Sequence, residues 1–87
     1  MIQFQVTVTA PGGLHARPAA LFVSRTSQSQ SKITLNKGEK MADGRSILGI
    51  MTLGISQGDH LTIQVDGSDE ERVAAEIQQL FQQEFAS

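Results

Sequence analysis

The residues best suited to chemistry in this chain are His15 and Arg17, which lie in residues 13–20, Gly-Leu-His-Ala-Arg-Pro-Ala-Ala. Pro18 has no backbone N–H and a fixed φ, so an α-helix accepts it only in the first turn, and the helix must begin between His15 and Pro18. The first N–H groups of a helix have no intrahelical partner and carry partial positive charge. The segment therefore predicts an anion site in which the backbone of Ala16 and Arg17 and a planar guanidinium flank an imidazole nucleophile.

Phosphoryl transfer is the reaction that this combination suits. A neutral imidazole attacks phosphorus through one ring nitrogen while the other keeps its proton, so the orientation of the ring must be fixed. The transferred group spreads its charge over three oxygens, and catalysis is mainly positioning and electrostatic stabilisation. We expect the amides of Ala16 and Arg17 and the Arg17 guanidinium to share that stabilisation.

Length and composition limit the other possible functions. The 87 residues predict one domain, residues 1–87, with a shallow surface site in place of an enclosed cavity. The formal charge is −2, and the seven basic residues form no cluster, which argues against nucleic acid as a partner. The chain has no Trp or Tyr and four scattered Phe residues, so it offers no platform on which bases could stack.

The sequence gives no sign of a metal, a cofactor or a membrane. The chain has no cysteine, which excludes disulfides, thiolate catalysis and cysteine metal sites. His60 stands without other ligand-type residues in a metal-binding pattern, so we expect an ordinary surface residue. The N-terminal residues alternate between polar and apolar, unlike a signal peptide, and no apolar run could span a bilayer. We therefore expect a cytoplasmic monomer with no cofactor.

The elements that must position the site follow from periodicity. Residues 2–8 alternate as a half-buried strand, and a helix follows from about residue 16 that ends in the polar residues 24–31. Its helical spacing is carried by four apolar residues: Ala16, Ala19, Ala20 and Val23. Residues 33–35 and a return through Met41 predict a hairpin.

Three further elements complete the chain. Ser46 is placed to N-cap a short helix that runs to about Leu53. Residues 61–65 alternate as the last strand, after which Ser68 and Glu71 predict a capping box for a third helix. The apolar stripe of that helix consists of Val73, Ile77, Leu80, Phe81 and Phe85. The order βαββαβα with one-sided strands predicts an α+β fold, a four-stranded antiparallel sheet covered on one face by three helices.

The second helix is apolar on nearly every side. If Ile50 and Leu53 face the sheet, then Ile47, Leu48 and Met51 share an outward face, which is typical of a docking surface. The alternative is that neighbouring elements bury the whole helix. The sequence leaves both interpretations open.

These motifs, over the whole chain, resemble HPr, the histidine-containing phosphocarrier family of the bacterial phosphoenolpyruvate-dependent sugar phosphotransferase system. The resemblance rests on residues 13–20 and on residues 44–54, Gly-Arg-Ser-Ile-Leu-Gly-Ile-Met-Thr-Leu-Gly. It implies the HPr-like fold, an open-faced β-sandwich. It also implies that His15 accepts a phosphoryl group at Nδ1 from phosphorylated enzyme I and passes it to the A component of a sugar permease.

The resemblance implies further roles. Ser46 corresponds to the residue that a regulatory kinase phosphorylates in those bacteria that have one, with a phosphorylase and a transcription regulator as further partners. The partner-binding surface corresponds to Ala16, Ala20, Ile47, Leu48, Gly49 and Met51. Some family members carry lysines in the second half of the first helix, where this chain has Ser24, Arg25 and Ser27, so we expect weaker electrostatic steering. The residues alone explain no role for the Ser/Gln-rich loop 27–31.

Two alternatives to a general sugar carrier stay open. The chain could be a specialised or regulatory relative that serves one branch of phosphotransfer. It could also be an interaction module that binds a regulator through Ser46 and the apolar second helix without carrying phosphate. The pairing of His15 with Arg17 argues against the second alternative.

Overall fold

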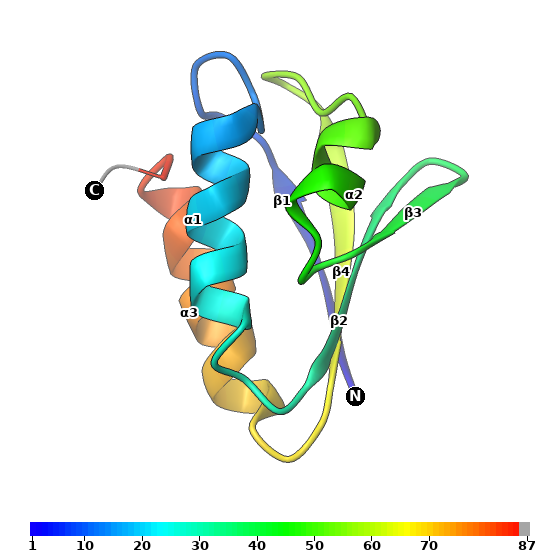
Figure 1. The fold of residues 1–87 in the computed structure, drawn as a ribbon, viewed down its shortest axis with the longest axis vertical. Coiled ribbons are helices and arrows are strands. Elements are labelled where there is room, and N and C mark those ends of the chain that lie inside the picture. Colours follow the sequence, from blue (N-terminus) through cyan, green and yellow to red (C-terminus); the bar gives the residue numbers. More distant parts are fainter. Residues whose placement is uncertain (86–87) are drawn as a thin grey trace.

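The computed structural model describes residues 1–85; of the predicted 1–87 domain, residues 86–87 lie outside the described part. The described residues form four strands and three helices in the order predicted from the sequence (Figure 1). The strands are β1 (Ile2–Thr7), β2 (Lys32–Lys37), β3 (Lys40–Asp43) and β4 (His60–Asp66). The helices are α1 (Ala16–Thr26), α2 (Ile47–Thr52) and α3 (Glu70–Gln82).

The sheet is antiparallel throughout, in the order β1-β4-β2-β3. Its alternating residues confirm the predicted one-sided burial: Leu61, Ile63 and Val65 of β4 are buried, whereas Thr62 and Gln64 between them face the open side. The three helices pack on the same side of the sheet, with α1 next to both α2 and α3 (Figure 1). The predicted α+β architecture is confirmed.

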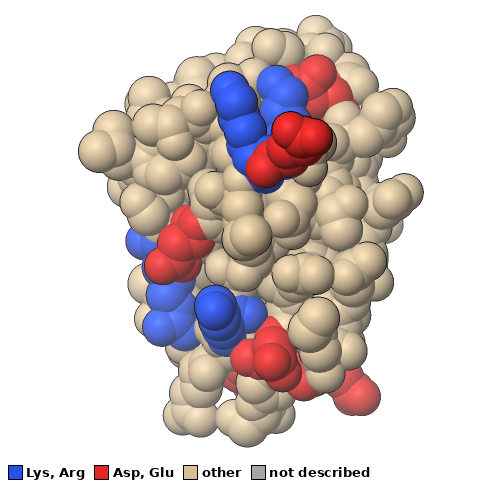
Figure 2. All heavy atoms as spheres, turned by 90° about the vertical axis from the view of Figure 1, so that its right-hand side faces the viewer, with Lys and Arg blue, Asp and Glu red and all other residues tan. Residues whose placement is uncertain are grey.

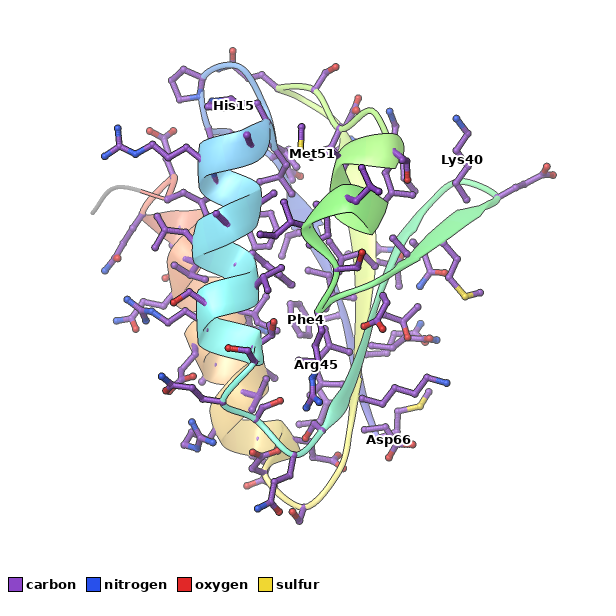
Figure 3. The ribbon with its side chains drawn as sticks, in the orientation of Figure 1. Phe4, His15, Lys40, Arg45, Met51 and Asp66 are labelled. Carbon is purple, nitrogen blue, oxygen red and sulfur yellow. The ribbon has the colours of Figure 1, made fainter. Side chains whose placement is uncertain are left out.

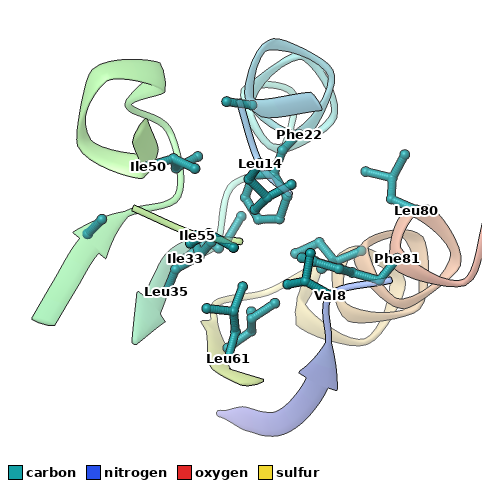
Figure 4. Close-up of a cluster of buried hydrophobic side chains, with 14 of the residues drawn as sticks. Val8, Leu14, Phe22, Ile33, Leu35, Ile50, Ile55, Leu61, Leu80 and Phe81 are labelled. Atoms are coloured by element: carbon teal, nitrogen blue, oxygen red, sulfur yellow. The ribbon is translucent and has the colours of Figure 1, made fainter. Parts of the chain in front are cut away.

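The core lies between the helices and the sheet (Figure 4). Each helix contributes a large side chain, Phe22 from α1, Ile50 from α2 and Phe81 from α3, and the first two of these are fully buried. Phe22 and Phe81 meet edge to face with ring centroids 6.3 Å apart, which fixes α1 against α3.

Helix α1 ends within the polar residues 24–31, as predicted, but its buried face is rotated relative to the predicted stripe. It continues into the polar run as far as Thr26, and its buried residues include Phe22 and Thr26, whereas Ala16 and Ala20 are exposed. Thr26 can occupy a fully buried position because its hydroxyl donates a 2.8 Å hydrogen bond to the carbonyl oxygen of Gly44. Because this hydrogen bond joins residues 18 apart in the chain, the periodicity of α1 could not predict that Thr26 is buried.

The predicted capping box at the start of α3 is wrong. The helix has Asp69 as its N-cap, and the hydroxyl of Ser68 donates to Oε1 of Gln30 at 3.1 Å instead of capping. The Asp69 carboxylate accepts hydrogen bonds from the Ser31 hydroxyl and from the backbone N–H of Gln30, the latter at 2.9 Å. Ser68 and Asp69 thus form hydrogen bonds with residues 30–31 of the loop after α1 instead of capping α3.

The Ser/Gln-rich loop 27–31 therefore has a structural explanation. In addition to its bonds with Asp69, it receives hydrogen bonds from Arg45, whose Nη2 donates to the carbonyl oxygens of Ser29 and Ser31, the latter at 2.9 Å. Ser29 and Ser31 are both buried. The loop thus supplies acceptors to the Arg45 guanidinium and donors to the Asp69 carboxylate.

Candidate functional site

His15 is the N-cap of α1, as the position of Pro18 predicts. Its backbone is extended, with φ −80° and ψ −166°, and its carbonyl oxygen accepts the first helical hydrogen bond from Ala19 N–H at 3.0 Å. Its side chain makes no capping bond and is exposed (Figure 3). The imidazole is thus presented to solvent at the positive end of the helix.

The loop before His15 is held by a close backbone contact with residues 55–56. The Leu14 N–H donates to the carbonyl oxygen of Ile55 at 3.2 Å, and a Cβ on Gly13 would lie 2.2 Å from that oxygen. Gly13 also has φ +70°, which favours glycine. A Cβ on Gly12 would lie 3.2 Å from Cδ2 of His15, so the backbone itself forms one side of the imidazole's surroundings. Gly12 and Gly13 therefore allow the backbone conformation that sets the position of the His15 side chain.

Arg17 lies in the first turn of α1 and lines, together with His15, an open depression of about 340 Å³. Ala10, Pro11 and Pro18 form other parts of its wall. Two predicted residues of the anion site, His15 and Arg17, thus line one depression, and Ala16 is the first residue of α1 between them in the chain. The depression is shallow and open, as the short chain predicts.

Two residues from the C-terminal part of the chain also line this depression, and the sequence did not predict them as part of a site. Glu84 and Phe85 follow α3, both with positive φ, and the turn that they form brings them into the lining of the depression. Phe85 is buried, with its ring 4.9 Å from that of Phe81. The apolar stripe predicted the burial of Phe85, but no local signal predicts the turn that places Glu84 in the same depression as His15.

Helix α2 presents an apolar face to solvent. Ile50 and Leu53 are buried, whereas Ile47, Leu48 and Met51 are 41%, 74% and 42% exposed. The predicted outward apolar face is therefore present, and neighbouring elements do not bury the whole helix. His15 and Met51 lie toward the same end of the molecule (Figure 3). We call the set of exposed apolar residues on the two neighbouring helices the apolar patch: Ala16, Ala20, Ile47, Leu48 and Met51.

Ser46 N-caps α2, as predicted. Its hydroxyl oxygen accepts a hydrogen bond from the Gly49 N–H at 2.9 Å, and its own N–H donates to the carbonyl oxygen of Asp43 at 3.1 Å. Ser46 and Gly49 are both partly exposed, and Ser46 directly precedes Ile47 of the apolar patch. The serine is therefore both a structural cap and a residue at the border of the patch.

The C-terminal end of α2 is held by a charged pair. Lys37 donates from Nζ to the carbonyl oxygen of Gly54 at 2.7 Å and forms an ion pair with Asp59 at 2.9 Å. The backbone N–H of Ser56 and the Lys37 ammonium group both lower the pKa of Asp59. On the side of the molecule shown in Figure 2, basic and acidic side chains lie close together in a few clusters, with wide uncharged areas between them.

Two observations concern other kinds of site. Among residues 1–85, no group of three or more His, Cys, Asp or Glu residues could hold a metal ion. No helix in this part of the chain has the length and apolar character that a membrane span requires.

Comparisons with known proteins agree with this geometry. A family model described as the PTS HPr component phosphorylation site matches residues 2–83. The phosphocarrier protein HPr of Buchnera aphidicola subsp. Acyrthosiphon pisum is 42% identical over 72 residues, which cover 83% of this chain and 85% of that protein. HPr of Haemophilus influenzae is 39% identical over 77 residues, or 88% of this chain and 91% of that protein. The crystal structure of HPr-C-His from Thermoanaerobacter tengcongensis has a TM-score of 0.95 and 38% identity, covering 100% of this chain and 98% of the other.

Proposed function

Because this chain belongs to the HPr family, the phosphocarrier proteins of the phosphotransferase system, we propose that His15 is the residue that carries the phosphoryl group. The phosphate comes from phosphorylated enzyme I and goes to the A component of a sugar permease. The observation that carries this proposal is the exposed imidazole at the N-cap of α1, in one depression with Arg17. His60, the other histidine, is not in that depression.

The proposed chemistry uses the imidazole of His15 and groups in the first turn of α1. A ring nitrogen of His15, Nδ1 by resemblance to the family, forms a bond to phosphorus as the bond between phosphorus and the donor breaks. The reverse exchange passes the group to the acceptor. The first-turn amides of Ala16 and Arg17 and the Arg17 guanidinium stabilise the phosphoryl oxygens in both directions. An open depression suits this exchange, because donor and acceptor proteins must each reach the phosphorus directly.

The apolar patch is proposed as the surface on which both partners dock. Its residues lie on α1 and α2, and His15 directly precedes Ala16, the first residue of the patch. Exposed aliphatic and methionine side chains in one patch are typical of protein interfaces. One surface used for two successive partners means that enzyme I must leave before the permease component binds.

Labelling with phosphoenolpyruvate and purified enzyme I tests the proposal. We expect the wild-type protein to gain one acid-labile phosphate and His15→Ala to gain none. The matched control is His60→Ala, which removes the second histidine and should leave labelling intact. An undiminished phosphoprotein mass peak in His15→Ala would contradict the proposal.

Arg17 has its own test. Arg17→Gln keeps hydrogen-bond donors but removes the permanent charge, so we expect the transfer rate to fall by about a hundred-fold, the usual cost of losing one stabilising donor. Arg25→Gln, a change in the last turn of the same helix, is the control and should be close to wild type. Equal rates for the two variants would show that Arg17 does not stabilise the transferred group.

We also propose Ser46 as a regulatory phosphorylation site for a serine kinase, with a transcription regulator as the reader of the modified state. A phosphate on Ser46 would sit at a helix N-terminus, so α2 should persist, while about two negative charges would adjoin Ile47 of the apolar patch. Docking of an acidic donor should weaken. Ser46→Asp is expected to accept phosphate from enzyme I more slowly than Ser46→Ala, and equal rates would count against regulation.

Transfer to a panel of permease A components distinguishes a general carrier from a specialised one. A general carrier should phosphorylate several A components at similar rates. Transfer to a single component would identify a dedicated branch of the system.

A further inference from the structure

The backbone of Ile55 and Ser56 supports the loop that ends at His15. The carbonyl oxygen of Ile55 accepts the 3.2 Å hydrogen bond from the Leu14 N–H, and both residues are buried. A Cβ on Gly13 would lie 2.7 Å from Cα of Ser56, so the two backbones pack closely together. A shift of this supporting segment would therefore shift the residue next to His15.

One carboxylate sets the conformation of the supporting segment. Oδ2 of Asp59 accepts a hydrogen bond from the backbone N–H of Ser56 at 2.8 Å. The backbone of Asp59 is fixed as well, because its N–H donates to the carbonyl oxygen of Ser56 at 3.0 Å. Its carbonyl oxygen accepts from the Val8 N–H at 2.8 Å. Asp59 therefore closes the turn 56–59 and joins it to the residue that follows β1.

Lys37, at the end of β2, holds both ends of the segment. Its Nζ donates to the carbonyl oxygen of Gly54 at 2.7 Å and lies 2.9 Å from Oδ2 of Asp59. Gly54 comes after α2, and Asp59 comes directly before β4. The ammonium group thus joins the two ends of residues 54–59, and the close contact with Gly13 lies between them.

This pair differs from an ordinary surface ion pair. The Lys37 and Asp59 side chains are 31% and 29% exposed, and each also bonds a backbone group of the supporting segment. The ion pair of Arg72 and Glu76, in contrast, joins two side chains one turn apart on α3. Partly exposed ion pairs contribute little to folding stability, so the main effect of the Lys37–Asp59 pair is the placement of the backbone that it bonds.

We propose that Lys37 and Asp59 are positioning residues for phosphoryl transfer, which act on His15 through the contact of Ile55 with Leu14. The inference rests on the proposed role of His15 as the phosphoryl carrier. Transfer requires the imidazole to be held in line with the donor phosphorus, and a displacement of about 1 Å can cost about a hundred-fold in rate. Neither Lys37 nor Asp59 lines the depression at His15, so both act at a distance from the transferred group.

Steady-state transfer from phosphorylated enzyme I tests the proposal, with this protein as the varied substrate. Asp59→Ala should lower kcat about tenfold and leave KM unchanged, because the apolar patch on which enzyme I docks is intact. Lys37→Met keeps the aliphatic part of the side chain and should have the same effect. Glu76→Ala is the matched control and should transfer as wild type, since it removes an ion-paired carboxylate of similar exposure, 33%, from α3.

Two further variants separate backbone positioning from charge alone. Asp59→Asn keeps an acceptor for the Ser56 N–H and should retain most of the wild-type kcat. The double variant with Lys37→Asp and Asp59→Lys restores an ion pair, but its side chains can neither donate to Gly54 nor accept from Ser56, so kcat should stay low. Recovery of kcat in the double variant would show that charge alone matters and would overturn the proposal.

Amide hydrogen exchange gives a measurement that does not depend on enzyme I. In Asp59→Ala the Leu14 N–H should exchange faster than in the wild-type protein, whereas that of Ile63, on the central strand β4, should exchange at the wild-type rate. Equal exchange of Leu14 in Asp59→Ala and Glu76→Ala would contradict the proposal, as would a change in KM alone.

The outcome for the wild-type protein separates this inference from the proposed function. A wild-type protein that takes no phosphate at His15 would refute the proposed function and this inference with it. A labelled wild-type protein and an Asp59→Ala variant of equal kcat would refute only the positioning role of the pair.

Discussion

The hydroxyl of Thr26 donates a hydrogen bond of 2.8 Å to the carbonyl oxygen of Gly44, which joins the last turn of α1 to the loop that leads into α2. Both residues are buried, and the Gly44 N–H donates in turn to the carbonyl oxygen of Ile33 at 2.8 Å. The start of α2, with Ser46, is therefore fixed to α1 and to β2 at once. The two helices that carry the apolar patch do not depend on surface contacts alone for their relative position.

Replacing Thr26 tests this connection. Thr26→Val keeps the shape of the side chain but leaves a buried carbonyl oxygen without its donor, so we expect a loss of about 1–3 kcal/mol in the free energy of unfolding. Thr26→Ser keeps the hydroxyl and removes one methyl group, which should cost about 1 kcal/mol. Urea denaturation measures both values, and a more stable Thr26→Val than Thr26→Ser would contradict the assignment.

Arg45 should be the main support of the Ser/Gln-rich loop. Arg45→Met removes the hydrogen bonds to the buried carbonyl oxygens of Ser29 and Ser31, which should cost about 1–3 kcal/mol and speed amide exchange in residues 29–32. Lys40→Met, a change at the exposed hairpin, is the control. If hydrogen exchange in the loop were the same in both variants, Arg45 would not be the support.

Asp69 should make stability sensitive to acid. Hydrogen bonds from the Ser31 hydroxyl and the Gln30 N–H lower the pKa of Asp69 below its ordinary 3.8. A depressed carboxyl pKa adds stability that is present above the unfolded-state value and is lost as the pH falls through the lower native value. Asp69→Asn should therefore flatten the fall in unfolding free energy below about pH 4. Denaturation curves over that pH range would show the same slope in both proteins if the bonds were absent in solution.

Substitutions on the exposed and buried faces of α2 should affect partner binding and stability differently. Leu48 is 74% exposed, so Leu48→Ser should change the unfolding free energy by less than about 0.5 kcal/mol while slowing phosphate transfer from enzyme I. Ile50 is fully buried, and Ile50→Ala should cost about 2–5 kcal/mol. Transfer rates measured well below the melting temperature of each variant make the comparison. Unchanged transfer in Leu48→Ser would remove this residue from the docking surface.

Gly13 should be more sensitive to substitution than another glycine with similar backbone. Gly13 and Gly38 both have positive φ, 70° and 60°, so alanine costs about 1–2 kcal/mol of strain at either position. At Gly38 the new Cβ meets nothing within 4 Å, whereas at Gly13 it would lie 2.2 Å from the carbonyl oxygen of Ile55. Gly13→Ala should lose more stability than Gly38→Ala and should also slow transfer, because the loop that positions His15 must move. Equal losses in thermal denaturation would argue against this close contact.

The sequence by itself determined the elements and most of the chemistry at their ends. The alternation of β4 placed Leu61, Ile63 and Val65 in the core, since side chains alternate between the two faces of any strand. Pro18 limited the start of α1 to residues 15–18, because proline is compatible only with the first helical turn, and the structure has His15 as the N-cap. Ser46 as the cap of α2 followed from the same kind of local rule.

Only the tertiary structure decided the features that join distant segments. The polar side chain of Thr26 can be buried because its hydroxyl donates to the carbonyl oxygen of Gly44, 18 residues along the chain. The Asp69 side chain does not cap α3, because its carboxylate accepts hydrogen bonds from Gln30 and Ser31. Glu84 reaches the His15 depression through a turn that follows α3, and β1 becomes an open edge through the order of the strands. Hydrophobic period and capping rules act over a few residues, whereas these contacts depend on how the sheet orders its strands and on where the helices lie across it.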